Sequence, residues 1–151
     1  MKRFSIAIAL VVGMWLAIAL PLAEAAPCLI VTLTGTQSGP SVLNGQAGAG
    51  TLVRYGEDGN DCGAVKLQLD TGRGTNMRLS QVKVTPVQLN AVFFTHMHGD
   101  HTEGLADVMM LRWYLKGPKL DVVCSADATS PLGHTNSCRQ YVAHVADAFL
   151  Q

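Results

Sequence analysis

The sequence predicts an α/β domain in which strands and helices form layers, preceded by a segment for export. Two observations lead to this fold class. Short apolar runs bounded by turn residues predict strands, and from Ala91 onward such runs alternate with longer segments of helical character. The composition, with 48% hydrophobic and 15% charged residues in 151, is sufficient for a buried core.

The first 25 residues have the organisation of a signal peptide. Two basic residues follow Met1, residues 4–20 are almost continuously apolar, and residues 23–25 are Ala-Glu-Ala, a cleavage pattern. We therefore expect residues 1–25 to be removed and the mature chain, residues 26–151, to lie in the periplasm or outside the cell. An uncleaved membrane anchor is the alternative, because the apolar run is close to the lower length limit for a span.

Cleavage would leave a nearly neutral chain. Loss of Lys2, Arg3 and Glu24 reduces the 11 basic and 11 acidic residues to 9 and 10, a formal charge of −1. Such a chain lacks the excess of lysine and arginine that binding to nucleic acid requires. We expect no nucleic-acid partner and, after cleavage, no stable association with a membrane.

Four cysteines occur in the exported part, at positions 28, 62, 124 and 138. In an oxidising compartment they favour disulfides over metal thiolates, since they are far apart and form no C-x-x-C pair. Three pairings are consistent with the sequence. If the first two strands form a hairpin, Cys62 returns near Cys28, which favours the pairs Cys28–Cys62 and Cys124–Cys138.

The first strands are predicted from four apolar segments, at residues 29–34, 52–55, 64–69 and 91–95. Turn residues at 57–61 separate the second segment from the third. Residues 36–50 are rich in glycine, serine, asparagine and glutamine. They predict either a plain surface loop or a wall of the active cleft.

The carboxy-terminal third predicts two helices around a fifth strand at residues 120–124. Thr102 is expected to cap the first helix, which ends before Gly117-Pro118. The predicted core face of that helix consists of Leu105, Val108, Met109, Met110, Leu111, Trp113, Tyr114 and Leu115. The pattern Ser137-x-x-Gln140 predicts a capping box before a last helix that extends to Leu150.

The segment HMHGDH, residues 96–101, places three imidazoles and a carboxylate directly after the fourth predicted strand. Side chains alternate in an extended segment, so His96 and His98 point to one side. Gly99 lets the backbone turn before Asp100 and His101. These two pairs of donors predict a metal site with one metal on each pair. A solvated cluster of structural histidines is the alternative.

This segment continues as Thr-Glu-Gly-Leu at residues 102–105, and the combination resembles the metallo-β-lactamase fold superfamily, in particular its ribonuclease Z-like and arylsulfatase-like branch. Residues 33–40 are similar to that branch's loop after the first strand. Residues 69–75 are similar to its Asp-x-Gly-x-Gly-Thr turn, where Arg73 departs from the acidic residue often found there. The resemblance covers most of residues 29–125.

The resemblance implies a metallo-β-lactamase-like αββα sandwich, in which two packed β-layers lie between helices and both halves supply metal ligands. Such domains are usually longer than the 151 residues of this chain. We therefore expect residues 26–151 to be the amino-terminal part of a truncated domain, comprising the first β-layer with its helices. His134 and His144 are expected to be ordinary surface or packing residues rather than replacements for later ligands.

The resemblance also implies roles for the site residues. His96 and His98 would bind a first metal, and Asp100 and His101 a second. Asp100 would also be the catalytic carboxylate that orients the attacking water. Asp70 matches an aspartate whose hydrogen bonds steady the ligand loop. The expected cofactor is Zn²⁺, two ions per complete site, with Mn²⁺ or iron as alternatives.

Together with export, the resemblance implies a metal-dependent hydrolase that acts on a small-molecule phosphate or sulfate ester through a metal-activated water. A β-lactam or thioester substrate is a weaker alternative, because those branches more often continue the motif with Gly-Gly. The alternative from another class is a non-catalytic exported module, stapled by disulfides, that binds a ligand or is vestigial. An uncovered first β-layer would also favour a homo-oligomer.

Overall fold

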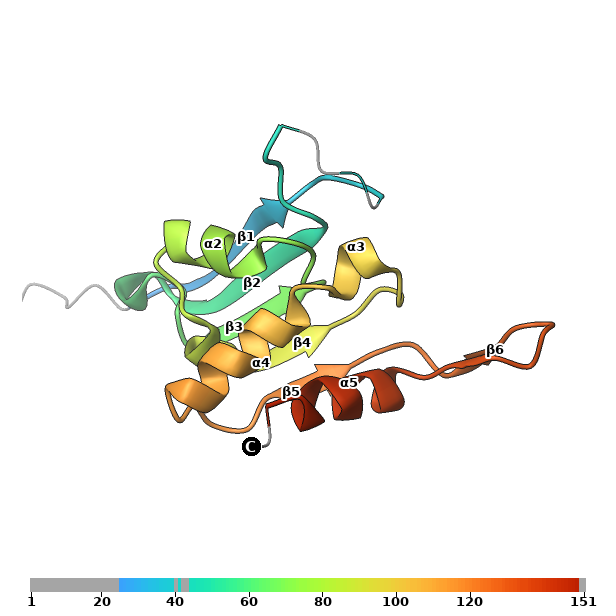
Figure 1. Ribbon diagram of the computed structural model, residues 1–151. Coiled ribbons are helices and arrows are strands. Elements are labelled where there is room, and N and C mark those ends of the chain that lie inside the picture. The colour runs from blue at the N-terminus through green and yellow to red at the C-terminus, as the bar shows by residue number, and fades with distance from the viewer. Residues whose placement is uncertain (1–24, 40, 42–43, 150–151) are drawn as a thin grey trace, which may run out of the picture.

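The computed structural model describes residues 25–39, 41 and 44–149 (Figure 1). Apart from Ala25, the predicted signal peptide lies outside the described residues, as does Leu150 at the predicted end of the last helix. Within the described part, no helix has the length and apolar character needed to cross a membrane.

Five strands among the described residues form one mixed sheet in sequence order. The first two pairings are antiparallel and the last two are parallel. The strands are β1 (Pro27–Gly35), β2 (Gly50–Glu57), β3 (Val65–Leu69), β4 (Ala91–Phe93) and β5 (Asp121–Val123). All five correspond to predicted strands, and the α/β class is confirmed.

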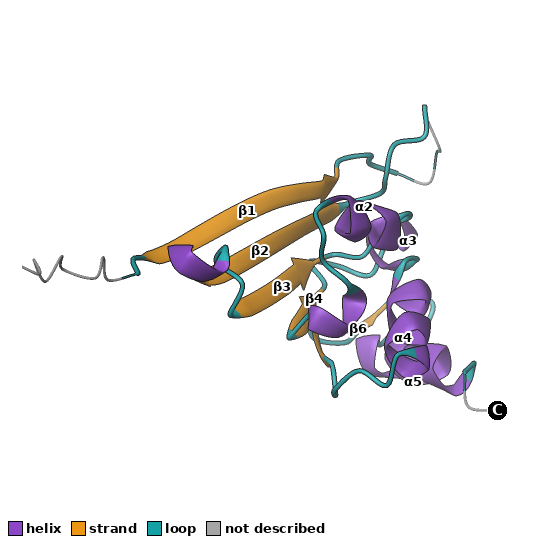
Figure 2. Ribbon diagram, turned by 90° about the vertical axis from the view of Figure 1, so that its left-hand side faces the viewer, coloured by secondary structure: helices purple, strands orange, loops and turns teal. Residues whose placement is uncertain are grey.

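The helices α2, α4 and α5 lie on one side of this sheet (Figure 2). The described helical elements are η1 (Asp58–Asn60), α2 (Thr75–Gln81), η2 (Pro86–Gln88), α3 (Gly99–Thr102), α4 (Leu105–Tyr114) and α5 (Cys138–Asp147). One half of the predicted capping box is present at the last helix, because the Ser137 hydroxyl accepts a hydrogen bond from the Gln140 backbone N–H at 3.4 Å. The sequence analysis did not predict α2, nor the hairpin of β6 (Ala128–Thr129) and β7 (Thr135–Asn136).

The prediction that Thr102 caps the long helix is wrong. Thr102 is the last residue of α3, and its hydroxyl donates to the His98 carbonyl at 3.1 Å. The long helix α4 begins three residues later, at Leu105, with Gly104 as its N-cap. A short helix, α3, and the separate helix α4 therefore replace the single capped helix that was predicted.

The predicted core face of α4 is also partly wrong. Trp113 and Tyr114 are 60% and 71% exposed, and Met110 and Leu115 are exposed as well. The buried positions of α4 are Leu105, Val108 and Arg112, which share one stripe of the helix. Arg112 takes a core position because its guanidinium donates to the carbonyls of Pro86, Leu89 and Pro118.

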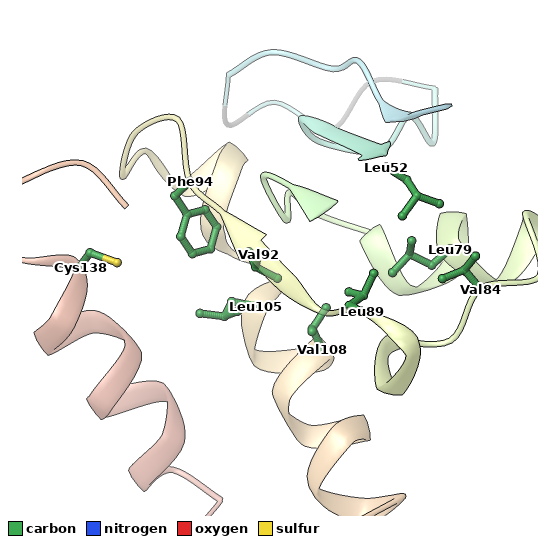
Figure 3. Close-up of a cluster of buried hydrophobic side chains, with 9 residues drawn as sticks. All are labelled: Leu52, Leu79, Val84, Leu89, Val92, Phe94, Leu105, Val108 and Cys138. Atoms are coloured by element: carbon green, nitrogen blue, oxygen red, sulfur yellow. The ribbon is translucent and has the colours of Figure 1, made fainter. Parts of the chain in front are cut away.

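The core lies between the sheet and the helices (Figure 3). It contains the β2 residue Leu52, the β4 residue Val92 and the α4 residues Leu105 and Val108, all with no exposed surface. The remaining buried members are Leu79, Val84, Leu89, Phe94 and Cys138. This packing fixes the end of β4, where the histidine motif begins.

The other face of the sheet carries none of the described helices (Figure 2). On it, Leu29, Val31 and Leu33 alternate along β1 and are 62%, 57% and 69% exposed. Tyr55, the β2 partner of Leu29, is 53% exposed. A contiguous apolar surface of this kind is characteristic of an interaction site, and the homo-oligomer expected from the sequence stays a prediction.

Both predicted disulfide pairings are confirmed. Cys28 and Cys62 are joined with their Cα atoms 5.5 Å apart, and Cys124 and Cys138 with theirs 6.1 Å apart. The first bond ties the start of β1 to the turn after η1. The second ties the segment after β5 to the first residue of α5, and so holds α5 against the core.

Replacing Cys124 and Cys138 together with serine is expected to lower the free energy of unfolding by about 3 kcal/mol, the value for closure of a loop of roughly this length. Cys138 is also buried in the core, so its loss adds to the effect. Urea denaturation of the oxidised protein measures the change. An unaltered midpoint would show that α5 is held without the disulfide.

Candidate metal centre

The histidine motif lies where the parallel strands β3 and β4 end. Their carboxyl ends are adjacent, so the residues that follow each strand meet at one edge of the sheet. Asp70 follows β3 directly, and its backbone N–H donates to the Phe93 carbonyl at 2.7 Å. The motif therefore starts beside a carboxylate that is distant in the sequence.

The three imidazoles are clustered. The His96 ring lies 4.5 Å from the His98 ring and 4.0 Å from the His101 ring, measured between centroids. His96 Nε2 and His98 Nδ1 are 3.0 Å apart. His96 and His98, which were expected to point to the same side, therefore lie together. His101 lies in the same cluster.

Asp70 orients His101. Its Oδ2 atom is 2.8 Å from His101 Nδ1, and its Oδ1 atom accepts the Thr95 backbone N–H at 2.8 Å. Asp70 has a positive φ of 56°, a conformation that aspartate tolerates better than most residues. A neutral His101 that donates its Nδ1–H to this carboxylate would keep the Nε2 lone pair for a metal, the arrangement typical of metal-binding histidines.

Thr95 is a site residue that the sequence analysis missed. Its hydroxyl lies 2.9 Å from Asp70 Oδ2, 3.1 Å from His96 Nδ1 and 3.3 Å from His101 Nδ1, so it connects the aspartate with two histidines of the motif. The only sequence signal was its place directly before the first histidine. The alternation of side chains in an extended strand predicts that Thr95 points away from His96 and His98. The backbone after β4 is irregular, so the Thr95 side chain lies on the same side as the histidines.

Asp100 is buried, and its carboxylate faces the loop between β1 and β2. Asp100 Oδ2 accepts the Gly39 backbone N–H at 2.7 Å and lies 3.6 Å from His101 Nε2. The Gly39 hydrogen bond holds the pKa of the Asp100 carboxyl below its usual value, against the opposing effect of burial. Of the two predictions for residues 36–50, a wall of the site is therefore favoured.

Glycines allow the supporting loops to interlock. Gly72 donates its N–H to the Ala49 carbonyl at 2.8 Å, and Gly104 donates to the Thr71 carbonyl at 2.7 Å. A Cβ atom on Gly72 would lie 2.5 Å from the Ala49 nitrogen and closer still to the Asp100 carbonyl oxygen. Only glycine fits such an approach, so the motif rests on the turn at residues 70–75.

A cavity of about 430 Å³ opens beside the motif. Its lining residues are Gly39, Arg73, His98, Gly99, Asp100 and Glu103. The Arg73 guanidinium pairs with the Glu103 carboxylate at 3.0 Å and donates to the Ser41 carbonyl at 3.2 Å. The cavity therefore has donors, carboxylates and an imidazole within reach of one small ligand.

The donor set fits a transition metal such as zinc, because it consists of imidazoles and a carboxylate with an oriented histidine. Within the described residues, however, no three His, Cys, Asp or Glu side chains are arranged to hold one ion. His134 is exposed in the hairpin that extends away from the sheet in Figure 1, and His144 is exposed on α5. The described residues of the motif therefore bring these donors close together without arranging three of them around one ion.

Comparisons with known sequences identify relatives of the part of the chain that contains the histidine motif. The family model described as anti-Pycsar protein Apyc1 matches residues 60–143, more than half of the chain. Ribonuclease Z of Mycolicibacterium gilvum (strain PYR-GCK) is 40% identical over 83 residues, covering 55% of this chain and 26% of the relative. Ribonuclease Z of Mycobacterium avium (strain 104) is 42% identical over 83 residues, covering 55% and 27%. The matched segment spans about a quarter of the length of these relatives.

The fold has a counterpart among solved structures. The metallo-β-lactamase fold protein YhfI from Bacillus subtilis superposes with a TM-score of 0.55 at 23% identity, covering 66% of this chain and 37% of YhfI. That likeness concerns the fold, which agrees with the resemblance found in the motifs. The chain belongs to the anti-Pycsar protein Apyc1 family, in the ribonuclease Z-like branch of the metallo-β-lactamase fold superfamily.

Proposed function

We propose that this chain supplies part of the active site of an exported, metal-dependent hydrolase that acts on a phosphate ester. The observation that carries the proposal is the contact of Asp70 with His101, because an Nδ1–H that donates to Asp70 would leave the His101 Nε2 atom available to a metal. Beside it, His96 and His98 bring two ring nitrogens to within 3.0 Å of each other. A histidine cluster that serves only to stabilise the fold does not need an oriented ring nitrogen of this kind.

His96 and His98 would hold one zinc ion, and Asp100 and His101 a second, with Mn²⁺ or iron as alternatives. When bound, such ions lower the pKa of a coordinated water and offset the negative charge of an ester under attack. Asp70 holds His101 in the required tautomer. The Gly39 N–H holds the Asp100 carboxylate in place, and this carboxylate would orient the attacking water.

The relatives favour phosphate over sulfate esters as the substrate class. Ribonucleases act on phosphodiester bonds, and two of the matched proteins carry the name ribonuclease Z. The near-neutral charge of the mature chain argues against RNA itself. We therefore propose a small-molecule phosphate ester that fits the cavity of about 430 Å³.

The second candidate is a non-catalytic exported module. It is favoured by one observation, namely that the described residues contain no complete set of metal ligands. Two disulfides would stabilise such a module outside the cytoplasm. The exposed apolar stripe of β1 adds the proposal that the chain associates with itself through this face.

The test is to measure zinc content and turnover of bis(p-nitrophenyl) phosphate and p-nitrophenyl sulfate. The chain is compared with a version extended by the carboxy-terminal half of a ribonuclease Z relative. A catalytic zinc usually has three protein ligands, so we expect weak zinc binding and slow turnover for the chain and chelator-sensitive phosphodiester turnover for the extended version. Turnover that survives removal of the metal would contradict the hydrolase proposal. Zinc binding without turnover in the extended version would favour the non-catalytic module.

A further inference from the structure

The cavity beside the motif carries charges of both signs. Asp100 and Glu103 contribute carboxylates, and Arg73 contributes the permanent positive charge among its described lining residues. An anionic ester that enters this cavity meets repulsion from two carboxylates. It can be held only where donors and positive charge outweigh this repulsion, as at Arg73 or at metal ions if the motif binds them.

Arg73 is held in place at the cavity wall. Its side chain is 25% exposed, pairs with Glu103 at 3.0 Å and donates to the Ser41 carbonyl at 3.2 Å. Its backbone carbonyl accepts the Gly48 N–H at 2.9 Å, which fixes the turn that carries it. A guanidinium anchored in this way loses little side-chain freedom when it binds a ligand, and its planar set of donors matches the oxygens of a phosphate.

We propose that Arg73 is a specificity-determining residue that binds the phosphate oxygens of the substrate directly and so selects anionic esters. The inference rests on the proposed function, since it concerns the cavity beside His98 and Asp100. It goes beyond that function because it assigns the choice of substrate to Arg73, which lines the cavity and is not one of the expected metal ligands. The selectivity would then be a property of this chain.

The test uses inorganic phosphate as the probe, titrated at low ionic strength into the metal-free chain and followed by phosphorus NMR. Arg73→Gln is expected to weaken phosphate binding about tenfold or more, because a charge-assisted bidentate contact is lost. Arg73→Lys should bind with intermediate affinity. Arg78→Gln is the matched control: Arg78 lies on α2, contacts Gln81 and Gly45, and does not line this cavity, so its loss should leave the affinity unchanged.

Glu103→Gln separates direct contact from simple charge neutralisation. If Arg73 contacts phosphate, Glu103→Gln alone binds phosphate as well as or better than the wild-type chain, and the double variant Arg73→Gln/Glu103→Gln stays as weak as Arg73→Gln. Recovery of wild-type affinity in the double variant would mean that Arg73 only neutralises Glu103, and it would overturn the proposal. Absence of detectable phosphate binding by the wild-type chain would overturn it as well.

Zinc content and steady-state kinetics separate this inference from the proposed function. In the extended version, Arg73→Gln should keep its zinc and raise the KM for bis(p-nitrophenyl) phosphate more than it lowers kcat. Zinc-dependent turnover with an unchanged KM in Arg73→Gln would refute the role of Arg73 and leave the hydrolase intact. Phosphate binding that depends on Arg73 in a protein without zinc-dependent turnover would support the inference and refute the hydrolase.

Discussion

Replacing His96 with alanine is expected to lower zinc affinity by more than about 100-fold, beyond the loss typical for a residue that only supports a ligand. His96 is a member of the first donor pair, with His98, and it also contacts His101 of the second pair. Its Nε2 atom lies 3.0 Å from His98 Nδ1, and its ring lies 4.0 Å from that of His101. Its removal would leave one nitrogen in the first pair and withdraw the ring that packs on the second.

Zinc affinity is measured by competition with a chromophoric chelator, and phosphodiester turnover is measured in the extended version. His144→Ala is the matched control, because it removes an exposed imidazole from α5. Turnover should fall with metal affinity in His96→Ala and remain at the wild-type level in His144→Ala. Equal zinc binding by both variants would exclude HMHGDH as the metal motif and would favour a structural histidine cluster.

Strands were the most predictable part of the fold, because β-branched and apolar runs bounded by turn residues carry their own signal. Even the pairing of Cys28 with Cys62 followed from the hairpin of β1 and β2. The boundaries of the helices were harder to predict from the sequence. Thr102 has the side chain of a cap, but the sharp turn at residues 98–104 uses its hydroxyl inside α3, and a propensity rule contains no term for that competition.

The exposure of Trp113 and the burial of Arg112 were not predictable either. Hydrophobicity assigns tryptophan to the core and arginine to the surface. Arg112 is buried because the carbonyls of Pro86 and Leu89, at the end of a distant turn, accept its N–H groups. These carbonyl groups come together around Arg112 only when the chain folds, so the sequence does not reveal them.

Residue types and spacing were enough to propose HMHGDH as a metal-binding motif, whereas the residues that support it could not be predicted in the same way. Asp70 was matched through the resemblance, and its contact with His101 spans 31 positions in the sequence. The contribution of Thr95 depends on the irregular backbone after β4. The spacing of a motif therefore predicts which atoms can bind, and tertiary structure decides how those atoms are oriented.

Replacing Gly72 with alanine is expected to lower the free energy of unfolding by at least about 3 kcal/mol, at the upper end of the usual cost of overpacking. The added methyl group would meet backbone atoms of Gly48, Ala49 and Asp100, which cannot turn away as a flexible side chain could. The Gly72 N–H also donates to the Ala49 carbonyl, so separating the two segments breaks a hydrogen bond. Such a loss is a large fraction of the total stability of a domain of this size.

Gly72→Ala should also lower the zinc affinity of the proposed metal site, because the Asp100 backbone forms part of the surface against which Gly72 packs. Gly59→Ala is the matched control, since a Cβ at that position would meet only the Ala25 side chain, at 3.8 Å. Urea denaturation and zinc competition are measured on both variants. Gly72→Ala should lose stability and zinc affinity together while Gly59→Ala keeps both, because the turn at residues 70–75 holds Asp70, Arg73 and the Asp100 backbone in one arrangement. Gly72→Ala with wild-type stability would mean that the loops can separate without cost, and that the site does not depend on their close approach.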